Sequence, residues 1–312
     1  MSSKTASPFR LAPFFSPRIW GTKDWSRWYD GKVFAEPVGE SWLTGEDCVV
    51  ETGPWAGGRF ADVVKAHAAE ILGEDAEVEF PLLLKLLAPK EKLSLQVHPD
   101  DAFARQMGYP RGKTECWYVL DAEPEAAVAL GFTEGTGPKE IREAVSNHTL
   151  EERMRWLPVT SGDMIFVDAG TVHAIGGGLT ILETQQTSDI TYRLYDYGRP
   201  RELHVDDALR VMKAQTRAGK VAPVQVDGFT RLIQERYFTV DRFELAAGRE
   251  YSFTSMPVPQ ILVALRGDAT LACNGESLAL ERGKATVIPA GAPAAVAGSA
   301  KGCTVARAFP GK

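Results

Sequence analysis

The sequence contains few histidines and few cysteines. Its five histidines and four cysteines are scattered over 312 residues. The cysteines show neither the paired spacings of a zinc ribbon nor the density of a disulfide-stabilised secreted domain. We therefore expect Cys48, Cys116, Cys273 and Cys303 to be reduced and mostly buried thiols.

Long apolar runs and a basic charge balance are also absent. The best candidate for a membrane span, residues 81–89, is far shorter than the roughly 18 residues required and contains Lys85. The N-terminus lacks the continuous apolar core of a signal peptide. A formal net charge of −6 argues against a general nucleic-acid-binding protein. We expect a cytoplasmic protein that binds neither membrane nor nucleic acid, and an anionic substrate would need a local cationic pocket.

The distribution of glycine and proline favours strands over helices. The 29 glycines and 19 prolines are spread along the sequence, as in folds with many short strands joined by turns. Helical patterns are confined to residues 61–72, 138–157 and 203–214. Beyond about residue 226 the pattern predicts strands only, with a type I′ hairpin at Asn274-Gly275. The sequence therefore predicts a mainly β fold with a small helical portion.

An internal repeat indicates that the fold is duplicated. Residues 162–175 align without gaps with residues 283–296, and the initial glycine, an apolar run and an Ala-Gly pair recur at matching places. His173 of the first copy stands opposite Ala294 of the second. We expect a second copy that keeps the turn but lacks the imidazole.

Three short segments carry residues suited to a metal ion. Gln96 and His98 are two residues apart on a predicted strand and so share one face. Glu115 follows Lys113 at the same spacing, and His173 lies between a turn and three glycines. Each segment alone is more typical of a structural or surface role. Together they offer two imidazoles, one carboxylate and one amide oxygen, which is a ligand set that zinc accepts while keeping a position for substrate.

These segments resemble type I mannose-6-phosphate isomerase of the cupin superfamily, in its short bacterial form. The motifs that carry the resemblance are PRIWG (17–21), GESW (39–42), LLLKLLAPKEKLSLQVHPDD (82–101), GKTECW (112–117), DAGTVHAIGGG (168–178) and LETQQTSDITYRLYDYGR (182–199). Long members of the family carry Lys-Pro-Glu where this chain has Lys113-Thr114-Glu115, and they have a larger helical domain.

The resemblance implies a fold and a set of site residues. It implies two cupin (jelly-roll-like) β-barrels: a catalytic domain over residues 1–220 with a small helical insertion, and a domain over residues 221–312 without metal ligands. It implies one Zn²⁺ per chain, held by Gln96, His98, Glu115 and His173. It also implies an active site lined by Lys113, Glu183, Asp189 and Arg193. Ser94 and Lys85 are further candidates for substrate contact.

The implied reaction interconverts mannose 6-phosphate and fructose 6-phosphate through an enediol. Such a reaction needs a base near the C1 and C2 protons and positive charge near O1 and O2. We nominate Glu183 and Asp189 as the base, with Lys113 as a rival. Lys113 and Arg193 could each meet the phosphate or the developing negative charge.

Other functions stay open from the sequence alone. One alternative is another cupin enzyme that shares the barrel, such as a glucose-6-phosphate isomerase. An iron-dependent dioxygenase would more often use two histidines and one carboxylate without an amide, so Gln96 weighs against it. A non-enzymatic sugar-binding cupin would not need the charged set around Arg193. The expected partner is a small-molecule sugar phosphate, and the chain could be a monomer or a homodimer.

Overall fold

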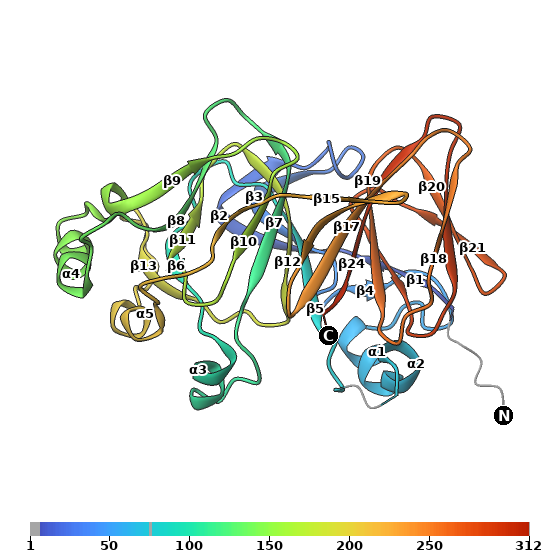
Figure 1. Cartoon of the computed structure of the whole chain (residues 1–312), viewed down its shortest axis with the longest axis horizontal. Coiled ribbons are helices and arrows are strands. Elements are labelled where there is room, and N and C mark those ends of the chain that lie inside the picture. The colour runs from blue at the N-terminus through green and yellow to red at the C-terminus, as the bar shows by residue number, and fades with distance from the viewer. Residues whose placement is uncertain (1–6, 75–76, 312) are drawn as a thin grey trace.

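The computed structural model describes residues 7–74 and 77–311, and strands dominate it (Figure 1). The prediction of a mainly β fold is confirmed. The described strands form four sheets, and none of these sheets closes into a barrel through its own strand pairing. The predicted closed barrels therefore stay a prediction.

Two of the sheets contain most of the N-terminal strands. The seven-stranded sheet has the order β14 (Gly219–Val221), β10 (Met164–Val167), β7 (Glu115–Ala122), β12 (Leu179–Gln186), β5 (Leu82–Leu87), β3 (Val33–Trp42), β2 (Phe14–Asp24). The five-stranded sheet has the order β13 (Tyr192–Tyr195), β6 (Leu95–Val97), β11 (His173–Ile175), β8 (Ala127–Phe132), β9 (Met154–Pro158).

The other two sheets contain the C-terminal strands. The eight-stranded sheet has the order β15 (Val224–Val226), β16 (Phe229–Gln234), β17 (Phe238–Leu245), β24 (Cys303–Pro310), β19 (Gln260–Arg266), β22 (Ala285–Ile288), β1 (Phe9–Ala12), β4 (Val49–Val50). The four-stranded sheet has the order β18 (Glu250–Phe253), β23 (Ala294–Gly298), β20 (Ala269–Cys273), β21 (Glu276–Leu280). The N-terminal strand β1 thus pairs with β22, among the red strands of Figure 1. The domain division predicted at residue 220 is not tested by this pairing and stays a prediction.

Hydrophobic cores separate the sheets into four successive layers. One core joins the inner faces of the seven- and five-stranded sheets through residues such as Trp117 and Val128. A second core joins the seven- and eight-stranded sheets, as Leu84 and Ile261 illustrate. A third fills the space between the eight- and four-stranded sheets. Three strands of the two central sheets, β5, β10 and β22, are buried along their whole length and are almost entirely apolar.

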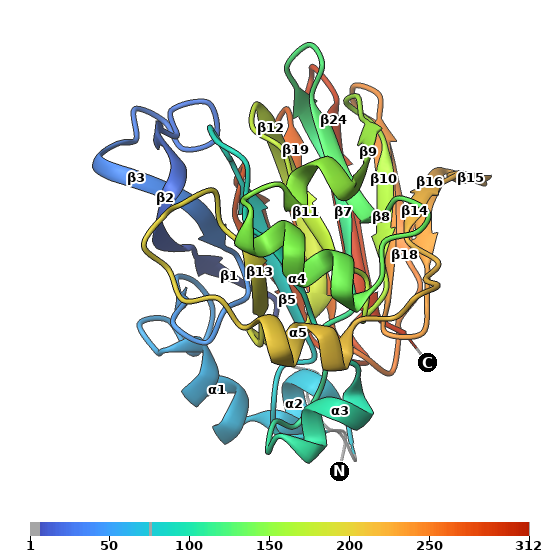
Figure 2. The same ribbon diagram turned by 90° about the vertical axis from the view of Figure 1, so that its left-hand side faces the viewer.

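The helices cover the outside of this stack, and their bounds differ from the sequence-based expectation. The segment 61–72 forms two short helices, α1 (Phe60–Ala66) and α2 (Ala68–Leu72), which break at His67. The segment 138–157 forms α4 (Pro138–Ser146) and a 3₁₀ turn (Leu150–Arg153), but Met154 already begins β9. Helix α5 (Val205–Val211) lies beside α4 over the five-stranded sheet, and α3 (Asp101–Gln106) lies below them (Figure 2).

The internal repeat corresponds to a repeated backbone. Gly162 and Gly283 both have positive φ, and so do Gly170 and Gly291 at the matching turn positions. His173 begins β11 and Ala294 begins β23. The hairpin at Asn274-Gly275 has positive φ at both residues, as a type I′ turn requires. The hairpin is therefore confirmed, and the two copies of the repeat share their turn conformations, while the duplication of a whole barrel stays a prediction.

The four cysteines are free and buried, as predicted. Among the described residues, no helix has the length and apolar character that crossing a bilayer would require.

A close contact between β2 and β3 shapes one wall of the site described below. Pro17 and Thr22 both pair with Val38, so residues 18–21 bulge out of the ladder. The ring of Trp20 then packs directly on Gly39, where an added Cβ would lie 2.4 Å from the ring. The bulge needs a glycine at position 39 because the Trp20 ring and the Cβ of Arg18 occupy the space of a side chain.

We predict that Gly39→Ala lowers the free energy of unfolding by about 1–3 kcal/mol, as overpacking usually does. Chemical denaturation measures this change. Gly219→Ala is the matched control, because an added Cβ at Gly219 meets no atom within 4 Å. Equal stability of the two variants would contradict the role of the Trp20 contact.

Candidate active site

A polar pocket lies at one end of the core between the seven- and five-stranded sheets. Along β12, Ile181 belongs to this inner core while Leu182 faces the opposite core, so Glu183 points inward with Ile181. The same alternation directs Glu115 inward beside Trp117 on β7. The alternation of side chains along each strand therefore directs charged residues to the inner face at one end of the core, where the rest of that face is hydrophobic.

Most of the predicted site residues line this cavity of about 480 Å³. They are Lys85, Ser94, Gln96, Lys113, Glu115, Glu183, Asp189 and Arg193. His98 and His173 lie just beneath it against Glu115. Leu93 lines the pocket and joins the inner core, whereas Leu95 and Val97 pack on the outer face. The strict alternation begins only where β6 begins, at Leu95.

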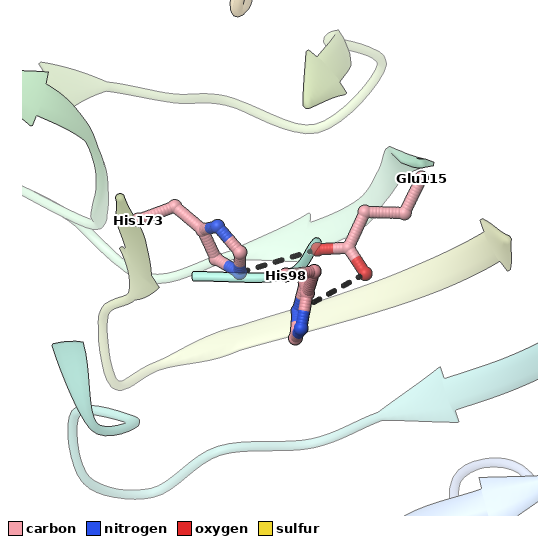
Figure 3. A group of neighbouring side chains, drawn as sticks. All are labelled: His98, Glu115 and His173. Atoms are coloured by element: carbon pink, nitrogen blue, oxygen red, sulfur yellow. Dashed lines mark ion pairs between the residues drawn. The ribbon is translucent and has the colours of Figure 1, made fainter. Parts of the chain in front are cut away.

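Two imidazoles meet one carboxylate in this cluster (Figure 3). His173 Nε2 lies 3.4 Å from Glu115 Oε1, and His98 Nε2 lies 3.8 Å from Glu115 Oε2. All three side chains are about 1% exposed. Their candidate ligand atoms lie within 4.8 Å of one another. Tetrahedral bonds of about 2.0–2.1 Å place ligand atoms roughly 3.3 Å apart, so a small contraction would let these atoms bind one ion.

Backbone carbonyls fix the orientation of both rings. His98 Nδ1 lies 2.8 Å from Ile190 O, and His173 Nδ1 lies 2.9 Å from Thr171 O. A carbonyl only accepts, so each Nδ1 carries the proton and each Nε2 presents a lone pair to the cluster. His98 Nε2 is buried with no hydrogen-bond partner among the described residues. This arrangement is typical of histidines that bind a metal through Nε2.

Burial keeps both imidazoles neutral. It lowers the pKa of His98 well below its ordinary value, and the charge of Lys113 adds to this effect. Burial also lowers the pKa of His173 to about 4, although its bond to Thr171 opposes the change. Neutral imidazoles are the form that binds a metal ion.

Gln96 is near the cluster, but its amide nitrogen, and not its oxygen, faces His173. Its Nε2 lies 3.4 Å from His173 Nε2, while its Oε1 accepts a hydrogen bond from Ser94 at 3.2 Å. A metal would require the amide oxygen in place of the nitrogen, which a half-turn of the amide provides. Ser94 therefore orients Gln96 as well as lining the pocket.

Lys113 and Glu183 share the charge balance of the pocket. Lys113 Nζ lies 3.0 Å from Glu115 Oε2. Burial opposes the charge of Lys113, but Glu115, Glu183 and Asp189 outweigh it and raise the pKa of Lys113. For Glu183, burial and the nearby Glu115 raise the pKa to about 7. Glu183 can thus exchange a proton near neutral pH, while Lys113 stays charged.

Lys85 lies between three carboxylates. Its Nζ is 3.8 Å from Glu40, 3.8 Å from Glu183 and 3.5 Å from Asp189. The ammonium also lies over the ring of Trp42. A buried lysine needs such partners, because an unpaired charge in the interior is costly.

Asp189 and Arg193 both line the pocket, but each has its own partner and they do not pair with each other. Asp189 is largely exposed and pairs with Lys85, whereas Arg193 Nη1 donates to Glu202 O at 2.9 Å. Arg193 Nε is buried without a hydrogen-bond partner. Burial and the neighbouring Arg201 lower the pKa of Arg193. This guanidinium is therefore poised to gain an anionic ligand.

Sequence reasoning missed three charged residues of the pocket. Arg18, Glu40 and Arg201 line it, and Arg18 forms a two-pronged ion pair with Glu40 at 3.2 Å. Arg18 lies within PRIWG and Glu40 within GESW, so both motifs were available as signals. Arg201 is held by Asp196 through two hydrogen bonds of 2.6 and 2.7 Å.

A β sandwich with histidines and a carboxylate on its inner face is the arrangement of a cupin enzyme. Residues 228–306 match a family model described as mannose-6-phosphate isomerase, cupin domain, and residues 9–137 match one described as phosphomannose isomerase type I, catalytic domain. The chain belongs to the type I phosphomannose isomerase family. The family predicted from the motifs, and the isomerase class with it, are confirmed.

Similar proteins cover nearly the whole chain. A mannose-6-phosphate isomerase of Streptococcus mutans is 32% identical over 298 residues, which are 91% of this chain and 93% of that protein. One from Bacillus subtilis is 34% identical over 257 residues, covering 78% and 81%. The crystal structure of a Bacillus subtilis mannose 6-phosphate isomerase matches with a TM-score of 0.86 at 30% identity, covering 97% of this chain and 99% of that one.

We predict that Glu183 titrates near pH 7 in the metal-free protein. Carbon NMR of labelled glutamate measures this, with Glu183→Gln to assign the signal. Added zinc should lower the midpoint, because a nearby cation favours the ionised carboxylate. A midpoint near the ordinary value of 4.5 in the metal-free protein would contradict the environment described here.

Proposed function

We propose that this protein is a zinc-dependent aldose–ketose isomerase that interconverts mannose 6-phosphate and fructose 6-phosphate through an enediol. The observation that carries the proposal is the pair of buried Nε2 lone pairs facing Glu115. The names of the relatives that are 32–34% identical support the choice of substrate. The partner is thus a small-molecule sugar phosphate; a cytoplasmic location and a monomeric or homodimeric state stay predictions.

We propose that Gln96, His98, Glu115 and His173 hold one Zn²⁺ per chain. The set offers nitrogen and oxygen donors only, which suits zinc, and three protein donors are enough for a catalytic site. When bound, zinc supplies a Lewis acid that stabilises negative charge on the substrate oxygens. Lys113 would assist from the same side, because its ammonium lies 3.0 Å from Glu115.

We assign the proton transfer between C1 and C2 to Glu183. Its raised pKa makes it a base that can also return the proton at neutral pH. Its Oε2 accepts a hydrogen bond from Trp117 Nε1 at 3.2 Å, which fixes the carboxyl in the pocket. Asp189 and Lys113 are the other candidates for the base. Asp189 is more exposed than Glu183, and Lys113 stays charged, so both are better suited to balancing charge than to taking a proton.

We propose that Arg193 binds the substrate anion at the pocket mouth. It has an unpaired Nε and two further guanidinium groups nearby, those of Arg18 and Arg201. Ser94 and Lys85 remain proposed substrate contacts because both line the same cavity.

We also infer two cupin barrels, one over residues 1–220 with the catalytic site and the helical insertion, and one over residues 221–312. The pairs of facing sheets and the repeated turns at Gly170 and Gly291 support this division. Ala294 stands at the place of His173, which supports a second barrel without metal ligands.

We predict that removing the metal abolishes isomerisation and that zinc restores it. The test assays fructose 6-phosphate formation from mannose 6-phosphate and, separately, from glucose 6-phosphate, before and after chelation. Undiminished turnover by protein shown to contain no metal would refute the zinc-dependent mechanism. Faster turnover of glucose 6-phosphate would refute the choice of substrate.

Two substitutions should separate metal binding from turnover. His173→Ala should lower zinc affinity by more than the 10–100-fold that loss of an outer hydrogen-bond partner costs, and activity should fall with it. Arg193→Ala should keep the zinc but lower kcat/KM by about 10²–10³-fold, because a charged donor to the substrate is lost. Exposed Arg249→Ala is the control for the second variant. A near-normal rate for Arg193→Ala would show that the assignment is wrong.

A further inference from the structure

The turn between β16 and β17, residues 235–237, lies outside the pocket but is linked to it. Together with Asp100, Asp101, Asp168 and Arg217, it lines a separate cavity of about 450 Å³. The turn belongs to the eight-stranded sheet, whereas the proposed metal ligands lie on, or directly after, strands of the seven- and five-stranded sheets. Two hydrogen-bonded chains cross from this turn toward those ligands.

The first chain runs from Tyr237 to the backbone beside Glu115. The hydroxyl of Tyr237 donates to Asp101 Oδ2 at 2.9 Å. Gln186 Nε2 donates to Asp101 Oδ1 at 2.9 Å, and Gln186 Oε1 accepts from the amide of Thr114 at 2.9 Å. Thr114 lies between Lys113 and Glu115, so this amide fixes the start of the strand that carries both side chains.

The same carboxylate also holds the approach to that strand. The amide of Gly112 donates to Asp101 Oδ1 at 2.9 Å, and the amide of Lys113 donates to Pro99 O at 3.0 Å. An added Cβ at Gly112 would lie 2.4 Å from Pro99 O, so the two backbones are in direct contact. Burial opposes ionisation of Asp101, but its donors outweigh burial and lower its pKa. The ionised carboxylate therefore accepts all three hydrogen bonds.

The second chain runs from Glu235 to the turn before His173. Arg217 binds Glu235 with two hydrogen bonds of 3.1 and 3.0 Å. The amide of Arg217 donates to both oxygens of Asp168 at 3.1 Å, and Asp168 Oδ1 accepts from Thr171 Oγ1 at 2.9 Å. Thr171 O is the carbonyl that orients His173. One turn thus supports the backbone at two of the proposed ligands.

We propose that Tyr237 is a positioning residue, which acts through Asp101 and Gln186 to hold Lys113 and Glu115 in the geometry that binds the metal. Glu235 does the same for His173 through Arg217 and Asp168. The C-terminal strands therefore support the metal site without contributing a ligand. This inference rests on the proposed metal site.

The test compares Tyr237→Phe with Tyr118→Phe. Tyr118 is the matched control because its hydroxyl also joins the two halves of the chain, but it does so by accepting from Arg242 Nη1 at 3.0 Å and not through Asp101. Four quantities are measured: zinc affinity by chelator competition, hydrogen–deuterium exchange of the peptide covering residues 112–116, kcat, and KM.

Tyr237→Phe should weaken zinc binding about three- to tenfold, lower kcat by a similar factor, leave KM within about twofold, and speed exchange of the 112–116 amides. Tyr118→Phe should leave all of these within about twofold of the unmodified protein. Indistinguishable variants would overturn the proposal, because the effect would then be a general loss of contact between the halves.

A double-mutant cycle tests the route and remains informative if one variant is unstable. Gln186→Leu should weaken zinc binding about 10–100-fold, and Tyr237→Phe should add little in that background, because the chain is already broken. Fully additive effects would overturn the route through Gln186.

If Tyr237→Phe does not fold, Glu235→Gln should weaken zinc binding about threefold, and unchanged affinity would contradict the role of the 235–237 turn. An unmodified protein that binds zinc but does not isomerise would refute the proposed function, while the affinity and exchange data would still decide this inference.

Discussion

The rest of the structure depends on the burial of two neutral imidazoles against one carboxylate. Placing Glu115, His98 and His173 in a dry interior is costly unless their lone pairs find a cation. Lys113 compensates for part of this cost through its ion pair with Glu115. The carbonyls of Ile190 and Thr171 compensate for another part by taking both Nδ1 protons. His98 Nε2 still has no hydrogen-bond partner among the described residues, and His173 Nε2 has only the Gln96 amide nitrogen at 3.4 Å, so a bound cation would use both lone pairs.

The charge of the pocket fits that reading. It is lined by five cationic side chains, Arg18, Lys85, Lys113, Arg193 and Arg201, and by four carboxylates, Glu40, Glu115, Glu183 and Asp189. The whole chain carries a net charge of −6, so this local balance is the opposite of the average. A divalent ion would make the site more positive still, and a phosphate dianion with a developing enediolate would neutralise it. The carboxyl of Glu183, with its pKa raised to about 7, suits the proton transfer that we propose for it.

The sequence predicted the backbone better than the side-chain partners. Strand alternation gave the shared face of Gln96 and His98 and of Lys113 and Glu115, and the repeat gave the equivalent turns at Gly170 and Gly291. Spacing could not reveal that Lys85 lies among three carboxylates or that Asp189 pairs with it instead of Arg193, because these contacts join strands distant in sequence. The helix expected through residue 157 ended early because Met154 packs as a strand residue, a tertiary effect that local pattern does not contain. The roles of the site residues remain predictions.

X-ray absorption at the zinc edge of zinc-loaded protein tests the central claim most directly. The account predicts two imidazole nitrogens at about 2.0–2.1 Å, with oxygen donors at about 2.0–2.2 Å completing the shell and no sulfur. A sulfur ligand at about 2.3 Å, or a shell with fewer than two imidazoles, would contradict the assignment of His98 and His173 as the ligands on which the site is built.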